Sequence, residues 1–402
     1  MKNEPKFASE PYRVFFPVAI LASVLGVMLW PMFYGEYISF YPSLAHARMM
    51  IEGFVGGFAI GFLGTAMPKM LGVQTFRLWQ VLLMLALHLS LCVAHLLGKW
   101  QLGDGVFVAL MALMFSILIP RIMQRKQLPP PGMVLAGMGL LCGMFGAFWG
   151  AFLEDYDGSY YGFLFSQRLL YQAFILLPLL GVGSFMFPMI LETEDKGKLS
   201  GKAWRRRAYL AWIAGVLIIG SYWFEVMGYT RAMSGCRFII AGLWFASECN
   251  CLRWKVGRGV MAQSLRAGIG CVLLALLAVA LVNKQKVALD HILYIGGFGL
   301  VTMIVATRVI FGHSGQGDKF KRWIKPLVVC VALLLLGMAT RVSADFIPVM
   351  RISHHVYAAI CWVVVSVIWG IAILPSVRKL PPEKKEMKAK KGFDMMDVDF
   401  RK

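Results

Sequence analysis

Seven histidines and several arginines interrupt the apolar runs that make up most of this sequence. Imidazole nitrogens are axial ligands of haem iron and equatorial ligands of copper, and a guanidinium group pairs with anionic groups such as haem propionates. Placing an Arg, Lys or Asp at the centre of a membrane helix costs roughly 2.5–3.5 kcal/mol on insertion scales, so such residues are functional candidates. What these histidines and arginines can bind depends on which helices carry them and on how deep in the membrane they lie.

The composition indicates a protein that is built almost entirely within a membrane. Of 402 residues, 59% are hydrophobic and only 15% are charged, which is outside the range of soluble globular domains. Twelve membrane helices of about 20 residues each would account for most of the chain. The formal net charge is +20, which in a soluble protein would suggest a nucleic-acid partner. The polar surface is too small for that reading, so we expect membrane lipid and no nucleic acid as a partner.

Apolar runs of 18 or more residues predict twelve membrane helices and an all-α polytopic bundle. We place the helices at 14–34, 46–68, 78–98, 105–122, 132–153, 167–191, 207–225, 229–252, 265–283, 290–312, 325–347 and 352–374. Residues 1–375 then form one transmembrane domain. Residues 376–402 form a basic tail that we expect to be cytoplasmic and disordered.

The lysines and arginines predict how this bundle is oriented. With a cytoplasmic N-terminus and twelve crossings, 31 of the 41 basic residues fall on the cytoplasmic side. Five fall in the opposite loops, among them Arg341 and Arg351, and five fall inside the predicted spans. Because Lys and Arg are enriched in cytoplasmic loops, this ratio favours twelve spans with both termini in the cytoplasm.

This orientation places most of the histidines near the outer side of the membrane. The predicted metal ligands on that side are His46, His95, His291, His354 and His355, and His88 lies near mid-membrane one heptad before His95. The predicted cofactor-binding arginines are Arg48, Arg231 and Arg237. Any one of these histidines alone is explained equally well as a solvated interfacial residue. Together they predict a haem or copper site on the outer side.

The tenth predicted span ends in Arg308 and His313, which we also consider as cofactor-binding residues. The alternative is that both residues complement the negative end of the helix dipole, with glycines ending the helix. The spacing alone does not decide between cofactor binding and an interaction with the helix dipole.

Several segments resemble the NnrS family of membrane proteins. PYRVFF at residues 11–16 resembles the family's P-F-R-x-F-F, and LAHARMMIEGF at 44–54 resembles W-H-A-H-E-M-L-F-G-F. GFLGTAMPKMLG at 61–72 resembles G-F-L-L-T-A-V-P-N-W-T-G, and residues 291–315 are similar to the family's H…G…G…T…R-x-x-L-G-H-T-G stretch. The resemblance covers most of the chain. The residues that it carries over are His46, Gly53, Thr65, Pro68, His291, Arg308 and His313.

The resemblance implies a bacterial inner-membrane protein that contains haem, for which we expect the b type, and copper, and that protects cells against nitric oxide and nitrosative stress. It assigns no turnover reaction. The sequence departs from the family pattern where Arg48 replaces the second histidine of the His-x-His pair, Met49 its glutamate and Ala45 its tryptophan. Copper is the cofactor that this departure most affects.

Two other function classes agree with the same features. Twelve spans with buried Arg, Glu and His are also typical of a solute or proton-coupled transporter. The loss of a histidine at position 48 also agrees with a metal-free scaffold subunit of a membrane complex. The metal content of the protein and the solute flux in reconstituted vesicles distinguish a cofactor-binding protein, a transporter and a scaffold subunit.

Overall fold

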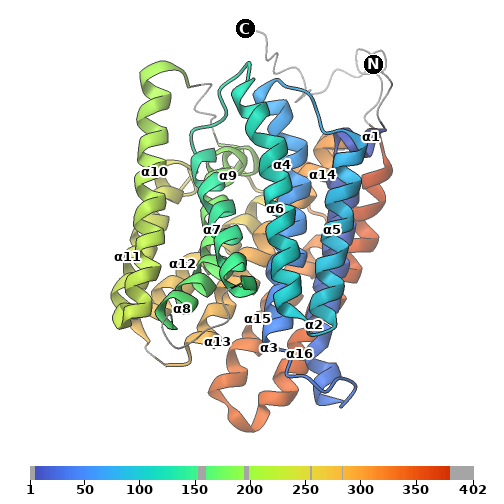
Figure 1. Cartoon of the computed structure of the whole chain (residues 1–402), viewed down its shortest axis with the longest axis vertical. Helices are drawn as coiled ribbons and strands as arrows, with labels where there is room; N and C mark the ends of the chain where they lie inside the picture. The colour runs from blue at the N-terminus through green and yellow to red at the C-terminus, as the bar shows by residue number, and fades with distance from the viewer. Residues whose placement is uncertain (1–4, 153–159, 194–198, 254–255, 283, 381–402) are drawn as a thin grey trace.

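The computed structural model describes residues 5–152, 160–193, 199–253, 256–282 and 284–380. These residues form helices joined by short connections, and none of them forms a strand. The long helices run roughly parallel to the long axis of the molecule (Figure 1). The predicted all-α bundle is therefore confirmed.

The long helices follow one another along the chain with short helical turns between them. In order they are α1 (Lys6–Ser9), α2 (Tyr12–Tyr34), α3 (Ser43–Arg48), η1 (Met49–Val55), α4 (Gly56–Leu71), α5 (Leu78–Leu96), α6 (Trp100–Met123), α7 (Met133–Phe152), α8 (Tyr160–Arg168), η2 (Leu169–Ala173), α9 (Phe174–Leu191), α10 (Gly201–Phe224), η3 (Glu225–Tyr229), α11 (Thr230–Ser247), α12 (Val260–Leu281), α13 (Lys286–His291), η4 (Ile292–Gly299), α14 (Leu300–His313), η5 (Gly317–Lys321), α15 (Lys325–Phe346), η6 (Pro348–Met350), α16 (Arg351–Ile373) and η7 (Leu374–Arg378).

Eleven helical segments of the described chain are long and apolar enough to cross a membrane, and one of them is a hairpin of two helices. Within this segment, Gly201–Ser247, the chain reverses at Gly228, whose φ of 105° lies outside the helical region. The reversal brings Arg207 Nη1 within 3.3 Å of Glu248 Oε2, 41 residues further along the chain. Helices α10 and α11 are thus separate crossings, and the bundle has the twelve that the sequence predicts.

The two described ends of the bundle meet at the same end of the molecule. Arg13, at the start of α2, donates hydrogen bonds to the backbone carbonyls of Val377 and Lys379, just beyond α16. An even number of crossings requires this arrangement. Helices α3 and α13 lie at the opposite end of the bundle from α1 (Figure 1). Most of the predicted basic tail, residues 381–402, lies outside the described residues.

The second, sixth and tenth spans form the interior of the bundle. In their most apolar windows 78%, 72% and 78% of residues are buried, against 28% in α15. Helix α4 contacts α14, and α9 contacts η4, so the three inner spans touch one another. These spans also start earlier than the sequence predicts, at Ser43, Tyr160 and Lys286. The tenth span extends to Lys286 because this lysine pairs with Asp290 and with Glu225 inside the bundle.

Each inner span contains a π-helical segment, in which the helix is wider than an α-helix. Segment η1 begins directly after Arg48, η2 after Arg168, and η4 after His291. Such segments are rare and often occur at functional sites. All three follow an ionisable residue in the first half of the span, so the irregular backbone and the polar side chains occur together.

We predict that Gly228→Ala destabilises the protein by about 1–3 kcal/mol, because alanine is strained at positive φ. Gly220→Ala is the matched control, since it lies within helix α10 and an added methyl group meets nothing within 4 Å. There alanine should be neutral or stabilising by up to about 1 kcal/mol. Thermal unfolding of the two detergent-purified variants measures the difference, and equal stabilities would contradict the hairpin.

Candidate functional site

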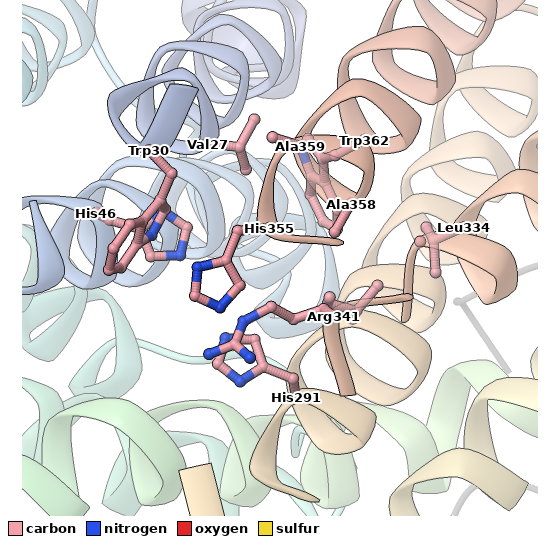
Figure 2. Close-up of a pocket in the computed structure, with 12 residues that line it drawn as sticks. Val27, Trp30, His46, His291, Leu334, Arg341, His355, Ala358, Ala359 and Trp362 are labelled. Atoms are coloured by element: carbon pink, nitrogen blue, oxygen red, sulfur yellow. The ribbon is translucent and has the colours of Figure 1, made fainter. Parts of the chain in front are cut away.

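Three histidines from three different spans share one cavity at the end of the bundle away from α1. They are His46 on α3, His291 on α13 and His355 on α16, and Arg341 on α15 lies beside them (Figure 2). The other walls are apolar or small, formed by Val27, Trp30, Ile295, Leu334, Gly337, Ala358, Ala359 and Trp362. The cavity volume is about 50 Å³, which is room for about three to five water molecules.

In each of the three imidazoles, nitrogen Nδ1 has a hydrogen-bond partner. Nδ1 of His46 lies 3.0 Å from the carbonyl oxygen of Gly26, and Nδ1 of His291 lies 2.6 Å from that of Val287. A carbonyl oxygen only accepts, so both rings must carry a proton on Nδ1. In the neutral rings, Nε2 is then left with a free lone pair.

His355 also has a partner at Nδ1, but this partner is a hydroxyl group, which can either donate or accept. Its Nδ1 lies 2.7 Å from the hydroxyl oxygen of Tyr34, and its Nε2 is buried without a hydrogen-bond partner. Trp30 packs against the ring, with centroids 5.2 Å apart. A second hydrogen bond that fixes the other ring nitrogen is typical of histidines that bind metals.

The three imidazoles surround the cavity and do not converge on one point. In the part of the chain that the structure describes, only Glu52, His95 and Asp104 form a group of three donor atoms within 4.8 Å of one another. One ion held by His46, His291 and His355 together would therefore require the side chains to move closer. A group larger than a bare ion, or an ion with two of the three ligands, fits the spacing better.

The other predicted metal ligands lie outside this cavity. His354 is next to His355, but its Nδ1 lies 2.9 Å from the hydroxyl of Ser343 and it does not line the cavity. His88 on α5 is fully buried, with its ring 5.8 Å from that of Phe15 on α2. His95 is hydrogen-bonded to Glu52 in a separate buried cluster.

None of the four predicted arginines lines the cavity. Arg48 pairs with Asp104, and Arg237 pairs with Glu225. Arg231 donates to the carbonyl of Ala280 over 3.0 Å. Arg308 stacks on the ring of Phe320, in the connection between the tenth and eleventh spans. The predicted outer-side arginines thus stabilise contacts between helices, and the structure does not bring them to the histidine cavity.

Arg341 lines the cavity, although it is not among the residues predicted to bind a cofactor. It lies within the predicted eleventh span, 325–347, but was counted with the loop that follows. Its guanidinium Nη1 is 3.0 Å from Asp345 Oδ2, one turn further along α15. An arginine inside a predicted membrane span was the signal that should have singled it out.

His313 is at the far end of the tenth span from His291, roughly 30 Å away for 22 helical residues. Its Nδ1 lies 2.9 Å from Glu10 Oε1, and Lys69 Nζ lies 3.0 Å from the same oxygen. This contact ties the tenth span to the start of the chain. His313 thus lies in the last turn of α14, as the interpretation based on the helix dipole predicts, and it is far from the histidine cavity.

The comparison with known families covers nearly the whole chain. The profile described as NnrS protein matches residues 6–379. The chain belongs to the NnrS family. Among curated proteins no match is found. The match includes all three cavity histidines, and it agrees with the resemblance of the segments around His46 and His291. NnrS membership and twelve membrane helices make this a multi-pass membrane protein.

The Glu10 cluster predicts how stability depends on pH at the α1 end. Burial would raise the pKa of Glu10, but the hydrogen bond to His313 and the charge of Lys69 outweigh it and hold this pKa well below its usual range. A lowered pKa in the folded state stabilises the protein above the unfolded pKa of about 4.3. This contribution is lost as pH falls through the folded pKa.

We therefore expect Glu10→Gln to lower the melting temperature of detergent-purified protein at neutral pH. The gap to the unmodified protein should shrink as pH falls below about 4.3, because protonation of Glu10 in the unfolded state removes the advantage given by its lowered pKa in the folded state. Glu36→Gln is the control, since Glu36 lies in the α2–α3 connection at the other end of the bundle. A gap that stays constant with pH would contradict the role of the Glu10 charge.

Proposed function

We propose that this chain binds a redox-active metal cofactor in the membrane and thereby protects bacterial cells against nitric oxide and nitrosative stress. The observation that carries the proposal is that His46, His291 and His355, from three different spans, share one cavity with Nδ1 of each ring hydrogen-bonded. Protection against nitric oxide is what the family resemblance implies, and the metal is the part that the geometry supports.

Haem is the cofactor that the chemistry of the cavity favours. Two of the imidazoles would hold the iron through Nε2, apolar walls such as Trp362 and Ala358 would pack against the macrocycle, and Arg341 would pair with a propionate. The volume of about 50 Å³ is far smaller than a haem. Haem binding therefore requires side chains that line the cavity to move aside.

Copper is the second candidate, and the third imidazole favours it. Haem iron uses at most two of the three histidines as axial ligands, whereas imidazole sets also suit copper. A copper ion with a small ligand needs much less room than a haem. Binding by all three residues would require their Nε2 atoms to approach one another from the present spacing.

The distribution of basic residues supports a location for this site. With 31 basic residues predicted on one side and five on the other, the termini are cytoplasmic and the α3–α13 end faces outward. We propose a bacterial inner membrane, with the histidine cavity toward its outer side. Nitric oxide is small and uncharged, so it reaches such a cavity from the membrane or from the periplasm.

The optical spectrum and the metal content of detergent-purified protein test the proposal. We expect either a haem Soret band that is lost in two of the variants His46→Ala, His291→Ala and His355→Ala, or stoichiometric copper without a Soret band that is lost in all three. His354→Ala is the matched control because it is the neighbouring histidine on α16 and does not line the cavity. Protein without haem or copper would refute the proposal and leave a transporter or a scaffold subunit, which flux measurements then separate.

Tyr34→Phe tests the hydrogen bond that orients His355. Removing the hydroxyl leaves His355 Nδ1 without its partner, and losing such a contact typically lowers metal affinity by roughly 10–100-fold. Tyr37→Phe is the control, since Tyr37 is 80% exposed in the loop after α2. Metal titration of the apo-proteins measures both affinities, and equal values would show that His355 is not a ligand.

A further inference from the structure

A second cluster of ionisable residues lies inside the bundle, apart from the histidine cavity. Arg48, Glu52, His95 and Asp104 are each 0% exposed and come from the second, third and fourth spans. No solvent reaches these side chains, so their charges must balance within the cluster. The cluster does not depend on any cofactor in the cavity.

One half of the cluster is an ion pair. Arg48 Nε donates to Asp104 Oδ1 over 2.9 Å, and Arg48 Nη2 donates to Asp104 Oδ2 over 2.9 Å. The remaining guanidinium nitrogen, Nη1, donates to Gln167 Oε1 over 3.1 Å and to the hydroxyl of Tyr171. This two-point contact compensates the charge of Asp104 and holds Arg48 in place.

The other half is a carboxylate and an imidazole. His95 Nε2 lies 2.9 Å from Glu52 Oε2, and the second atoms of both groups, Glu52 Oε1 and His95 Nδ1, are buried without hydrogen-bond partners. Carboxylate oxygens of Glu52 and Asp104 lie within 4.8 Å of each other and of His95. Two buried carboxylates this close repel each other when both are ionised.

Two glycines provide the room for this arrangement. A Cβ atom at Gly103 would lie 2.1 Å from His95 Cε1, and one at Gly150 would lie 2.4 Å from Asp104 Oδ2. Any larger residue would displace the imidazole or the carboxylate. The backbones of α6 and α7 therefore form a close-fitting pocket around the two side chains.

The formal charges of these four side chains indicate how much positive charge completes the cluster. Glu52 and Asp104 carry two negative charges and Arg48 carries one positive charge, so one negative charge is left when His95 is neutral. A divalent metal ion would turn this into a net positive charge beside the guanidinium of Arg48. A single proton shared by Glu52 and His95 makes these four side chains neutral and needs no further room, and their 2.9 Å contact is a hydrogen-bonding distance whichever of the two groups donates.

We propose that Glu52 and His95 form a proton-binding site in the membrane interior that holds one proton at neutral pH. Whether the proton is on the carboxyl or on the imidazole, the pair has the same total charge. The groups that face it are Arg48 and Asp104, with Gln167 and Tyr171 bonded to Arg48 and Cys92 close to Glu52. Release of this proton leaves a buried negative charge between the second, third and fourth spans, so proton binding is coupled to their packing.

Infrared spectra and variants that keep the shape of the side chains test this site. His95→Gln removes the imidazole, so the proton must then lie on a carboxyl group and a protonated-carboxyl band should be present at neutral pH. This band should be absent in the double variant Glu52→Gln/His95→Gln. Nitrogen-15 spectra of histidine-labelled protein show whether His95 carries the proton in the unmodified chain. Absence of both the carboxyl band and a doubly protonated His95 would overturn the proposal.

Stability at alkaline pH provides an independent measurement. Glu52→Gln removes the excess negative charge and needs no proton, so its melting temperature should exceed that of the unmodified protein increasingly as pH rises. Glu248→Gln, in the Arg207 pair at the end of α11, is the matched control and should show no such trend. A flat difference for Glu52→Gln would overturn the proposal.

Metal analysis distinguishes this site from the cofactor cavity. Replacing Glu52 should leave the metal content unchanged, whereas replacing His46 should remove metal if the cofactor proposal is right. A stoichiometric metal ion that Glu52→Gln releases and His46→Ala retains would show that the cluster binds a metal ion instead of a proton. The two proposals therefore fail through different results.

Discussion

Every ionisable group inside this bundle must find its partner within the protein, because hydrocarbon offers none. This constraint explains why the second, sixth and tenth spans, which are the most buried, each carry ionisable side chains that pair with residues of other spans. It also explains why the outer helices expose mainly apolar side chains such as Leu21, Leu243 and Ile371. The inner spans are where partners from several helices are within reach. The site and the bundle interior are thus consequences of the same requirement.

Two polar centres result, and they differ in chemistry. The histidine cavity has free imidazole lone pairs, apolar walls and an open volume, as a binding site requires. The cluster around Glu52 has charged and ionisable groups in direct contact with one another. The first centre is suited to binding a group from outside. The second holds only what neutralises its own charge, and the smallest cation is sufficient.

The sequence predicted the spans and three residues of the cavity, because hydropathy and loop charge determine the depth of a residue. His46, His291 and His355 were predicted at one level, and the structure brings them together. His95 and His354 lie at a similar depth and have other partners. Which residues meet depends on the rotation of each helix about its axis. The π-helical segments change this rotation within a span, and hydropathy carries no information on it.

The replacement of a histidine by Arg48 can be understood from helix geometry. Successive residues of an α-helix are about 100° apart, so residues 46 and 48 point in directions about 200° apart. His46 accordingly contacts the carbonyl of Gly26 on α2, whereas Arg48 contacts Asp104 on α6. The exchange therefore leaves the histidine cavity intact and changes the other centre. There it places a permanent positive charge beside two carboxylates, which reduces the charge still to be compensated to a single unit.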